Sequence, residues 1–168
     1  SKIVHALDTE PDSPFYRIVK SPARMEGERY VEFATFTDVL HDCFKGDYLP
    51  RVKALKSTKR VDKLFLEYCI TNGMAGVDTA VKMLKTCFRA VKDAFPDAWA
   101  RPPRESKLMH NVGIRAMLQF LTYLVADRKD LVSGPAQSLY EYLTKCLDTL
   151  RGKCYWTKES WEKQQLET

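Results

Sequence analysis

The stretch 106-SKLMHNVGIRAMLQFLTYLV-125 is mostly apolar, and its interpretation decides what kind of protein this is. A membrane-spanning helix needs about 20 predominantly apolar residues, and a central arginine costs about 2.5–3.5 kcal/mol on insertion scales. Arg115 and Gln119 therefore argue against a membrane span. We predict instead a central helix of a globular protein, apolar on most sides, from about Lys107 to Ala126.

Three polar side chains recur at four-residue intervals along this predicted helix: Asn111, Arg115 and Gln119. Residues four apart share one helix face, so the three form a row. Either the row hydrogen-bonds to neighbouring backbone or carboxylates, as buried polar groups must, or it forms with His110 a seat for a ligand or phosphate. Gly113 costs about 1 kcal/mol in a helix relative to alanine, so we expect another segment to approach closely there.

Length and composition predict a single domain over residues 1–168. The hydrophobic content of 45% is sufficient for a core, and the sequence has neither an internal repeat nor a low-complexity tract. The net charge of +5, from 27 basic and 22 acidic residues, permits binding to a polyanion without requiring it. The first residues lack the apolar core of a signal peptide, and the start at Ser instead of Met suggests a piece of a longer protein.

The cysteines favour a reducing, cytoplasmic compartment. Their number is odd and no two form a C-x-x-C pair, which argues against a disulfide framework and a zinc ribbon. They are Cys43, Cys69, Cys87, Cys146 and Cys154. The three histidines lie far apart and outside metal-ligand spacings, so we expect neither a metal nor a cofactor.

The amino-terminal part predicts a loop and a small β-hairpin over residues 8–34. Two short runs, 15–19 and 30–33, are rich in aromatic and β-branched residues and flank a segment rich in turn formers. We expect them to pair as the strands of the hairpin. Thr35, followed by Asp38, is typical of a helix start.

The remaining chain predicts a helical core over 35–151 and a C-terminal tail over 152–168. The clearest helix is 77-VDTAVKMLKTCFRAVKDAF-95, whose apolar residues recur at the helical period. A further helix is expected from about Ala136 to Arg151, after a break at Ser-Gly-Pro, and a short one in the tail. Trp99 is expected to be an anchor in the core. The predicted fold is therefore a compact, mainly α domain.

No motif on the chain indicates catalysis. The sequence has no glycine-rich phosphate loop, no G-x-S-x-G and no H-E-x-x-H. His41 and Cys43 are too close along one helix to hydrogen-bond as a base and its nucleophile. We therefore expect no catalytic residue, and the best candidates for an undetected enzyme site are His110, Asn111 and Arg115.

The basic residues give a better functional signal, in two groups. The first, which we call the basic stripe, lies within about 80° around the axis of helix 77–95, opposite its apolar face. It consists of Lys82, Lys85, Arg89 and Lys92. The second is the run 51–63, with Arg51, Lys53, Lys56, Lys59, Arg60 and Lys63. These cations predict sequence-independent, salt-sensitive binding to DNA, and the alternative is an ordinary solvated face.

Four stretches of the chain, taken in order, resemble a known family: 11-PDSPFYRI-18, 33-FATFTDVL-40, 89-RAVKDAFPDAW-99 and 108-LMHNVGIRAMLQFL-121. They are similar to the C-terminal part of the DGQHR-domain proteins, a ParB-related group that includes the DndB-like proteins of bacterial DNA phosphorothioate systems. The motif that names the family, Asp-Gly-Gln-His-Arg, is absent here, so no family residue can be assigned a catalytic role. The resemblance implies a helical accessory region linked to DNA modification, phage defence or its transcriptional control.

Two classes of function follow. In the first, the chain is a DNA-binding or regulatory module that acts through its outward cations. In the second, it is a non-catalytic structural or docking domain that contacts protein, either an upstream catalytic half of the same protein or a separate partner. Trp156 and Trp161, if exposed, would favour the second class, because aromatic anchors are enriched at interfaces. Neither class involves a membrane.

Overall fold

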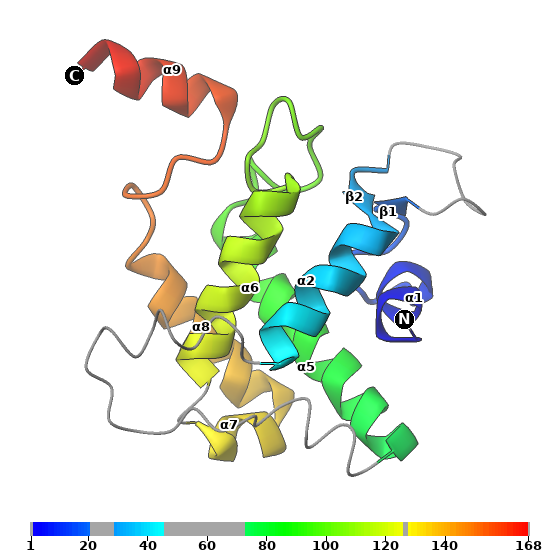
Figure 1. The fold of residues 1–168 in the computed structure, drawn as a ribbon. Helices are drawn as coiled ribbons and strands as arrows, with labels where there is room; N and C mark the ends of the chain where they lie inside the picture. Colours follow the sequence, from blue (N-terminus) through cyan, green and yellow to red (C-terminus); the bar gives the residue numbers. More distant parts are fainter. Residues whose placement is uncertain (1, 21–28, 46–72, 126–127, 168) are drawn as a thin grey trace.

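The computed structural model describes residues 2–20, 29–45, 73–125 and 128–167. Seven helices and two short strands make up the secondary structure of these residues, so the predicted mainly α fold is confirmed (Figure 1). In chain order the elements are α1 Lys2–Thr9, β1 Val19–Lys20, β2 Val31–Glu32, α2 Phe33–Lys45, α5 Gly73–Ala94, α6 Asn111–Val125, α7 Lys129–Ser133, α8 Ala136–Asp148 and α9 Lys158–Glu167.

The two strands form a small parallel sheet near the amino terminus, with Val19 opposite Val31 and Lys20 opposite Glu32. The predicted hairpin over 8–34 is therefore wrong, because the strands of a hairpin are antiparallel. Only Val19 of the first predicted run, and Val31 and Glu32 of the second, are in a strand. The predicted helix start at Thr35 is also wrong, since α2 begins directly after β2 at Phe33.

Asp8, at the end of α1, explains why the two strands lie side by side. Its buried carboxylate accepts a hydrogen bond of 3.1 Å from the backbone N–H of Val19 and two, of 3.0 and 3.1 Å, from the guanidinium of Arg29. Arg29 also donates to the carbonyl of Val19 at 2.6 Å. One buried ion pair therefore connects α1, β1 and the segment that enters β2, and the opposite charges satisfy each other away from water.

A cluster of aromatic rings joins the amino-terminal part to the helices. The ring of Phe15 lies 4.8 Å from that of Phe36 on α2, 4.7 Å from that of Phe88 on α5 and 5.3 Å from that of Trp99. Trp99 is buried, as predicted, and its indole N–H donates to the carbonyl of Pro14 at 3.3 Å. The core is thus assembled from segments that are far apart in the sequence.

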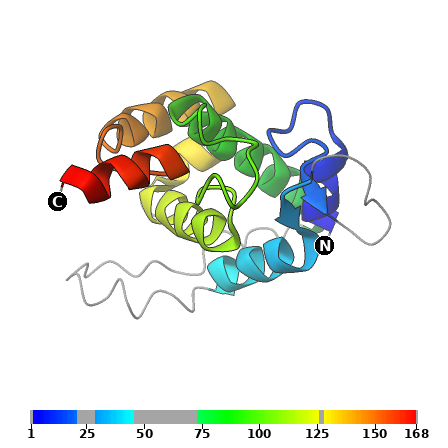
Figure 2. The same ribbon diagram turned by 90° about the horizontal axis from the view of Figure 1, so that it is seen from above.

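The long helices pack around this core in pairs. α5 lies against α8 and α1, and α6 lies against α2, while α9 is at the periphery in both views (Figures 1 and 2). α5 starts four residues before the predicted Val77 and ends at Ala94, one residue before the predicted Phe95. The predicted break before α8 is confirmed at Gly134 and Pro135, and so is a final helix, α9. The short helix α7 was not predicted.

α6 begins at Asn111, so the predicted start near Lys107 is wrong. The preceding residue, His110, caps the helix: its carbonyl accepts from the N–H of Ile114 at 3.0 Å, and its Nδ1 accepts from the N–H of Val112 at 3.3 Å. The close approach expected at Gly113 is confirmed, because a Cβ atom there would lie 1.8 Å from the carbonyl oxygen of Lys107.

The residues before α6 pair with the C-terminal tail, which keeps them out of the helix. Ser106 lies opposite Thr157 in an antiparallel bridge. The N–H of Lys107 donates to the carbonyl of Trp156 at 2.8 Å, and the N–H of Lys158 donates to the carbonyl of Glu105 at 2.9 Å. The tail is therefore joined to the helical core by backbone hydrogen bonds, which the sequence pattern did not indicate.

Candidate nucleic-acid interface

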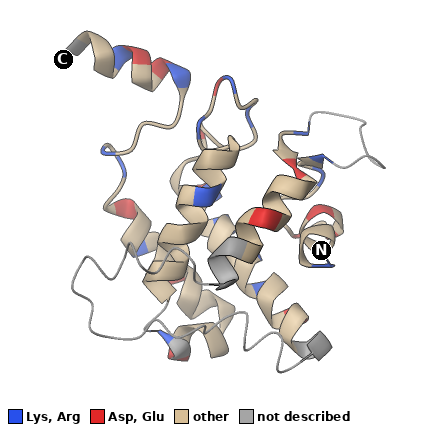
Figure 3. Cartoon of the chain, viewed as in Figure 1, with Lys and Arg blue, Asp and Glu red and all other residues tan. Residues whose placement is uncertain are grey.

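The basic stripe lies on α5, a helix with one fully buried side. Apolar residues at the helical period fix that side in the core, among them Leu84, Phe88 and Val91. Lys82, Arg89 and Lys92 project from the opposite side and are exposed. Basic residues also occur on several other helices (Figure 3), so the distinguishing property of these three is their common direction on one rigid element.

Lys85, the fourth member of the stripe, already forms ion pairs within the chain. Its side chain is only 15% exposed and its ammonium group pairs with Glu10 and, at 2.6 Å, with Asp12. The hydrogen bond from Lys85 lowers the pKa of Asp12. Burial lowers the pKa of Lys85, but the hydrogen bonds to Asp12 and Glu10 outweigh it, so the pKa is raised. Lys85 therefore connects α5 to the loop after α1 and is not available to a phosphate.

Arg89 is exposed but held in place by α8. Its guanidinium lies 4.7 Å from the ring centre of Tyr140. The hydroxyl of Tyr140 donates to the carboxylate of Asp93 at 2.5 Å, and this hydrogen bond raises the pKa of Tyr140. Arg151 lies beside this group, since it donates to the backbone carbonyl of Asp93 at 3.2 Å, and it also pairs with Asp148 at 3.3 Å. The neutral ring of Tyr140 orients Arg89 without cancelling its charge, and Asp93 keeps its own negative charge.

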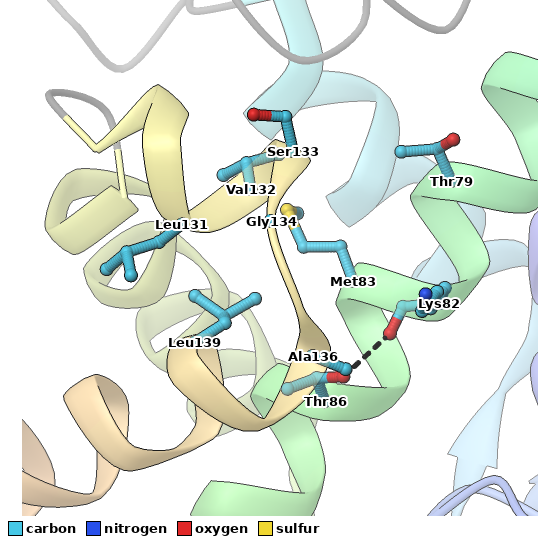
Figure 4. Close-up of a pocket in the computed structure, with 10 residues that line it drawn as sticks. All are labelled: Thr79, Lys82, Met83, Thr86, Leu131, Val132, Ser133, Gly134, Ala136 and Leu139. Atoms are coloured by element: carbon cyan, nitrogen blue, oxygen red, sulfur yellow. Dashed lines mark hydrogen bonds between the residues drawn. The ribbon is translucent and has the colours of Figure 1, made fainter.

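A small hollow lies at the Lys82 end of the stripe, where α5 meets the junction of α7 and α8 (Figure 4). Its volume is about 160 Å³, and its lining includes Thr79, Met83 and Leu139. Thr86 also lines it, but its hydroxyl donates to the carbonyl of Lys82 at 3.0 Å. Ligand pockets usually measure roughly 300–1,000 Å³, so this hollow is smaller than a usual ligand pocket.

A larger hollow of about 420 Å³ lies at the Lys92 end, between the carboxyl end of α5 and the loop after α1. We call it the Tyr16 hollow. Half of its lining residues carry rings, namely Pro11, Pro14, Tyr16, Pro96 and Trp99, and the others include Ser13, Lys92 and Asp93. The stripe is thus bounded by a minor hollow at one end and by a ligand-sized one at the other.

The predicted polar seat lies on the outward half of α6. Asn111, Arg115 and Gln119 are half-buried and share that side with the exposed Val112 and Tyr123. The half of α6 that contains Leu118 and Leu121 faces the core, and the helix is apolar on most sides, as predicted. His110 uses its Nδ1 for the helix cap, and no residue of this row lines either hollow.

The remaining candidate residues from the sequence do not form a further site among the described residues. The basic run 51–63 lies outside the described residues, and so does the side chain of Cys43. Burial raises the pKa of the Cys87 thiol to about 12, so it stays protonated and is a poor nucleophile. Within the described ranges, no group of three or more His, Cys, Asp or Glu side chains could hold a metal ion. None of the described helices has the length and apolar character needed to cross a membrane.

The two tail tryptophans do not provide exposed anchors. Trp156 packs against the core, with its ring 6.0 Å from that of Phe95. Trp161 is half-buried, with the ammonium group of Lys107 4.1 Å from its ring centre. Both rings therefore serve contacts within the chain.

Comparison with known proteins adds no assignment. Neither a family model, nor a curated protein, nor a solved structure matches this chain. The resemblance to the DGQHR-domain proteins therefore stays a prediction. The four stretches that carry it include Phe15, Phe36, Trp99 and Gly113, all of which pack in the interior.

Proposed function

We propose that this chain is a non-enzymatic helical module that binds DNA through Lys82, Arg89 and Lys92, as part of a DndB-like protein of a bacterial DNA-modification or defence system. The observation that carries the proposal is the common direction of these three exposed cations on a helix fixed in the core. Lys82 and Lys92 are ten residues apart, or about 15 Å along the axis. Phosphates of one DNA strand recur every 3.4 Å or so of axis, so about four of them face the stripe.

The acids beside the stripe are engaged in contacts within the chain. Lys85 pairs with Glu10 and Asp12 on one flank and offsets one of their two negative charges. On the other flank, Asp93 keeps its charge but accepts the hydrogen bond of Tyr140, and Arg151, which pairs with Asp148, donates to its backbone carbonyl. Arg89 is held over Tyr140, so it loses little side-chain entropy when it binds a phosphate.

Fluorescence anisotropy with a labelled short DNA duplex tests the proposal. Three phosphate contacts predict a fall in affinity of about 40-fold between roughly 50 and 200 mM salt. The triple variant Lys82→Glu, Arg89→Glu and Lys92→Glu is expected to abolish binding. The matched control changes three other exposed lysines to glutamate, Lys145, Lys153 and Lys163, and so alters the net charge equally. Equal loss in both variants, or loss in neither, would contradict a role for the stripe.

A protein-docking function is the second candidate, and the outward face of α6 favours it. Val112 is 69% exposed and Tyr123 49% exposed, and they are eleven residues apart, which places them on the same side of the helix. Ala116 lies between them and is also exposed. Exposed apolar and aromatic side chains in one line are typical of contact surfaces. Co-purification with a segment upstream of this chain, lost in the variant Val112→Asp and Tyr123→Asp, would support this function.

A further inference from the structure

The Tyr16 hollow is suited to a flat ring. Its walls combine the phenol ring of Tyr16 with three prolines, Pro11, Pro14 and Pro96. The indole N–H of Trp99 is already bonded to Pro14, so this part of the lining offers no free donor. A planar heterocycle gains dispersion and stacking contacts from such rings, and a volume of about 420 Å³ lies in the range of small-molecule pockets.

The backbone around the hollow is held in an unfavourable conformation. Among the described residues, the two non-glycine residues with positive φ are Arg17, at 58°, and Ala100, at 52°. Ala100 lines the hollow, and Arg17 lies between Tyr16 and Ile18, which both line it. Left-handed backbone is unfavourable for residues with a Cβ atom, and such residues cluster at ligand sites. The conformation brings the segments 16–18 and 96–100 to the same opening.

Cations stand beside the ring-lined walls. Lys92 is exposed and lines the hollow. The guanidinium of Arg17 lies 5.1 Å from the ring centre of Tyr16, and Arg17 is also exposed. The acid that lines the hollow, Asp93, accepts the hydrogen bond of Tyr140. A ligand that combines a flat ring with a negative group matches both features, and a nucleotide has this combination.

We infer that the Tyr16 hollow binds the base of one nucleotide, with its phosphate at Lys92, and that the module therefore prefers single-stranded to duplex DNA. This inference rests on the proposed function, because Lys92 belongs to both the hollow and the stripe. A base inside a duplex is paired and stacked, so it must be exposed before it can enter a pocket. In a single strand the base is free to stack on an aromatic side chain.

The test compares a short oligodeoxyadenylate with a duplex of the same length at one salt concentration. The native chain is expected to bind the single strand more tightly. Tyr16→Ala is expected to weaken binding of the single strand about tenfold, as loss of one stacked base does, and to leave duplex binding unchanged. Tyr16→Phe keeps the ring and is the matched control, expected to bind both like the native chain.

A second measurement needs no variant. Adenosine 5′-monophosphate is added to the native chain while the three indole N–H resonances are followed by NMR. The resonance of Trp99, in the lining of the hollow, is expected to shift, whereas those of Trp156 and Trp161 stay in place. This arm supports or overturns the inference even if Tyr16→Ala fails to fold.

The outcomes separate the two proposals. Equal affinity for both DNA forms, with no shift of Trp99, overturns the nucleotide site and leaves the stripe in place if the triple glutamate variant still loses binding. A shift of Trp99, with DNA binding unaffected in the double variant Lys82→Glu and Arg89→Glu, which keeps Lys92, supports the nucleotide site and overturns the proposed function. If Tyr16→Ala loses affinity equally for single-stranded and duplex DNA, and the Trp99 resonance does not shift, the nucleotide site is also overturned.

Discussion

α5 and α6 are both long amphipathic helices, yet their outward faces differ in kind. α5 presents Lys82, Arg89 and Lys92, whereas α6 presents Val112 and Tyr123. Their inward faces are alike, since both consist of aliphatic and aromatic residues in one hydrophobic cluster. The inward faces therefore explain why the chain folds, and the outward faces determine which class of partner each helix can contact.

The two helices also show that a side chain on an outward face is not always free to contact a partner. The sequence predicts Lys85 on the outward face of α5, but in the structure its ammonium group pairs with Glu10 and Asp12. Tyr123 belongs to the outward face of α6 and is 49% exposed. Substitutions on the two helices, and on the segments that pack against them, can break or sharpen this contrast.

The largest effect on stability is expected from Phe15→Ala, because Phe15 packs against the inward face of α5. Phe15 is fully buried against Phe36, Phe88 and Trp99, so truncation removes contacts with all three and leaves a cavity. We expect the free energy of unfolding to fall by about 3–5 kcal/mol, measured by urea denaturation. Tyr123→Ala, on the outward side of α6, is the control and should change it by less than about 0.5 kcal/mol. Similar losses in the two variants would remove the distinction between the faces.

Gly113→Ala tests the inward side of α6. The added Cβ would meet the carbonyl oxygen of Lys107 at 1.8 Å, a backbone atom that cannot turn away. We expect a loss of about 2–3 kcal/mol in the free energy of unfolding, typical of severe over-packing. At an open helical position the same change would stabilise by up to about 1 kcal/mol. A more stable variant in thermal and urea denaturation would show that the contact is not real.

Ala100→Gly tests the link between the two helices. At φ of 52° a glycine is not penalised as alanine is, so we expect stabilisation of about 1 kcal/mol. Alanine to glycine at Ala116, within α6, should instead destabilise by about 1 kcal/mol. Destabilisation by Ala100→Gly in calorimetry would contradict the left-handed conformation.

The smallest effect is expected from Lys85→Gln, on the outward face of α5. The pairs of Lys85 are partly exposed, so we expect a loss of no more than about 1 kcal/mol at neutral pH. The lowered pKa of Asp12 means that its contribution is present above pH 3.8 and is lost as the pH falls further. The raised pKa of Lys85 means that its contribution is present below pH 10.5 and is lost as the pH rises further.

Urea denaturation of the native chain and Lys85→Gln across this pH range measures the difference. The two stability curves should converge in acid, where Asp12 is protonated in both. A difference that stays constant below pH 3.8 would show that Asp12 is not the partner.

The sequence predicted those parts of the fold that local periodicity determines. The inward faces of α5 and α8 followed from apolar spacing, and Trp99 was expected to be an anchor in the link after α5. Gly113 was identified because glycine is costly in a helix. The family-like stretches contain most of the aromatic residues of the core, among them Phe15, Phe36 and Trp99, so they indicate how the chain packs and say little about its surface.

The features that sequence missed depend on contacts between distant residues. The parallel pairing of β1 and β2 depends on the ion pair of Asp8 with Arg29, and the occupation of Lys85 depends on acids more than 70 residues away. His110 caps α6 although histidine is not among the residues that usually do so. The Tyr16 hollow likewise combines two separated segments, and neither contains a recognisable binding motif.

The bridge between Ser106 and Thr157 has a consequence for the order of events during synthesis. The backbone of Lys107 presses on Gly113 at the start of α6, and the carbonyl of Trp156 holds that backbone in place. While the ribosome is still translating residues 108–155, this partner does not yet exist. The beginning of α6 therefore gains this hydrogen bond only after Trp156 has emerged, whereas the contacts between α5 and α1 become available earlier.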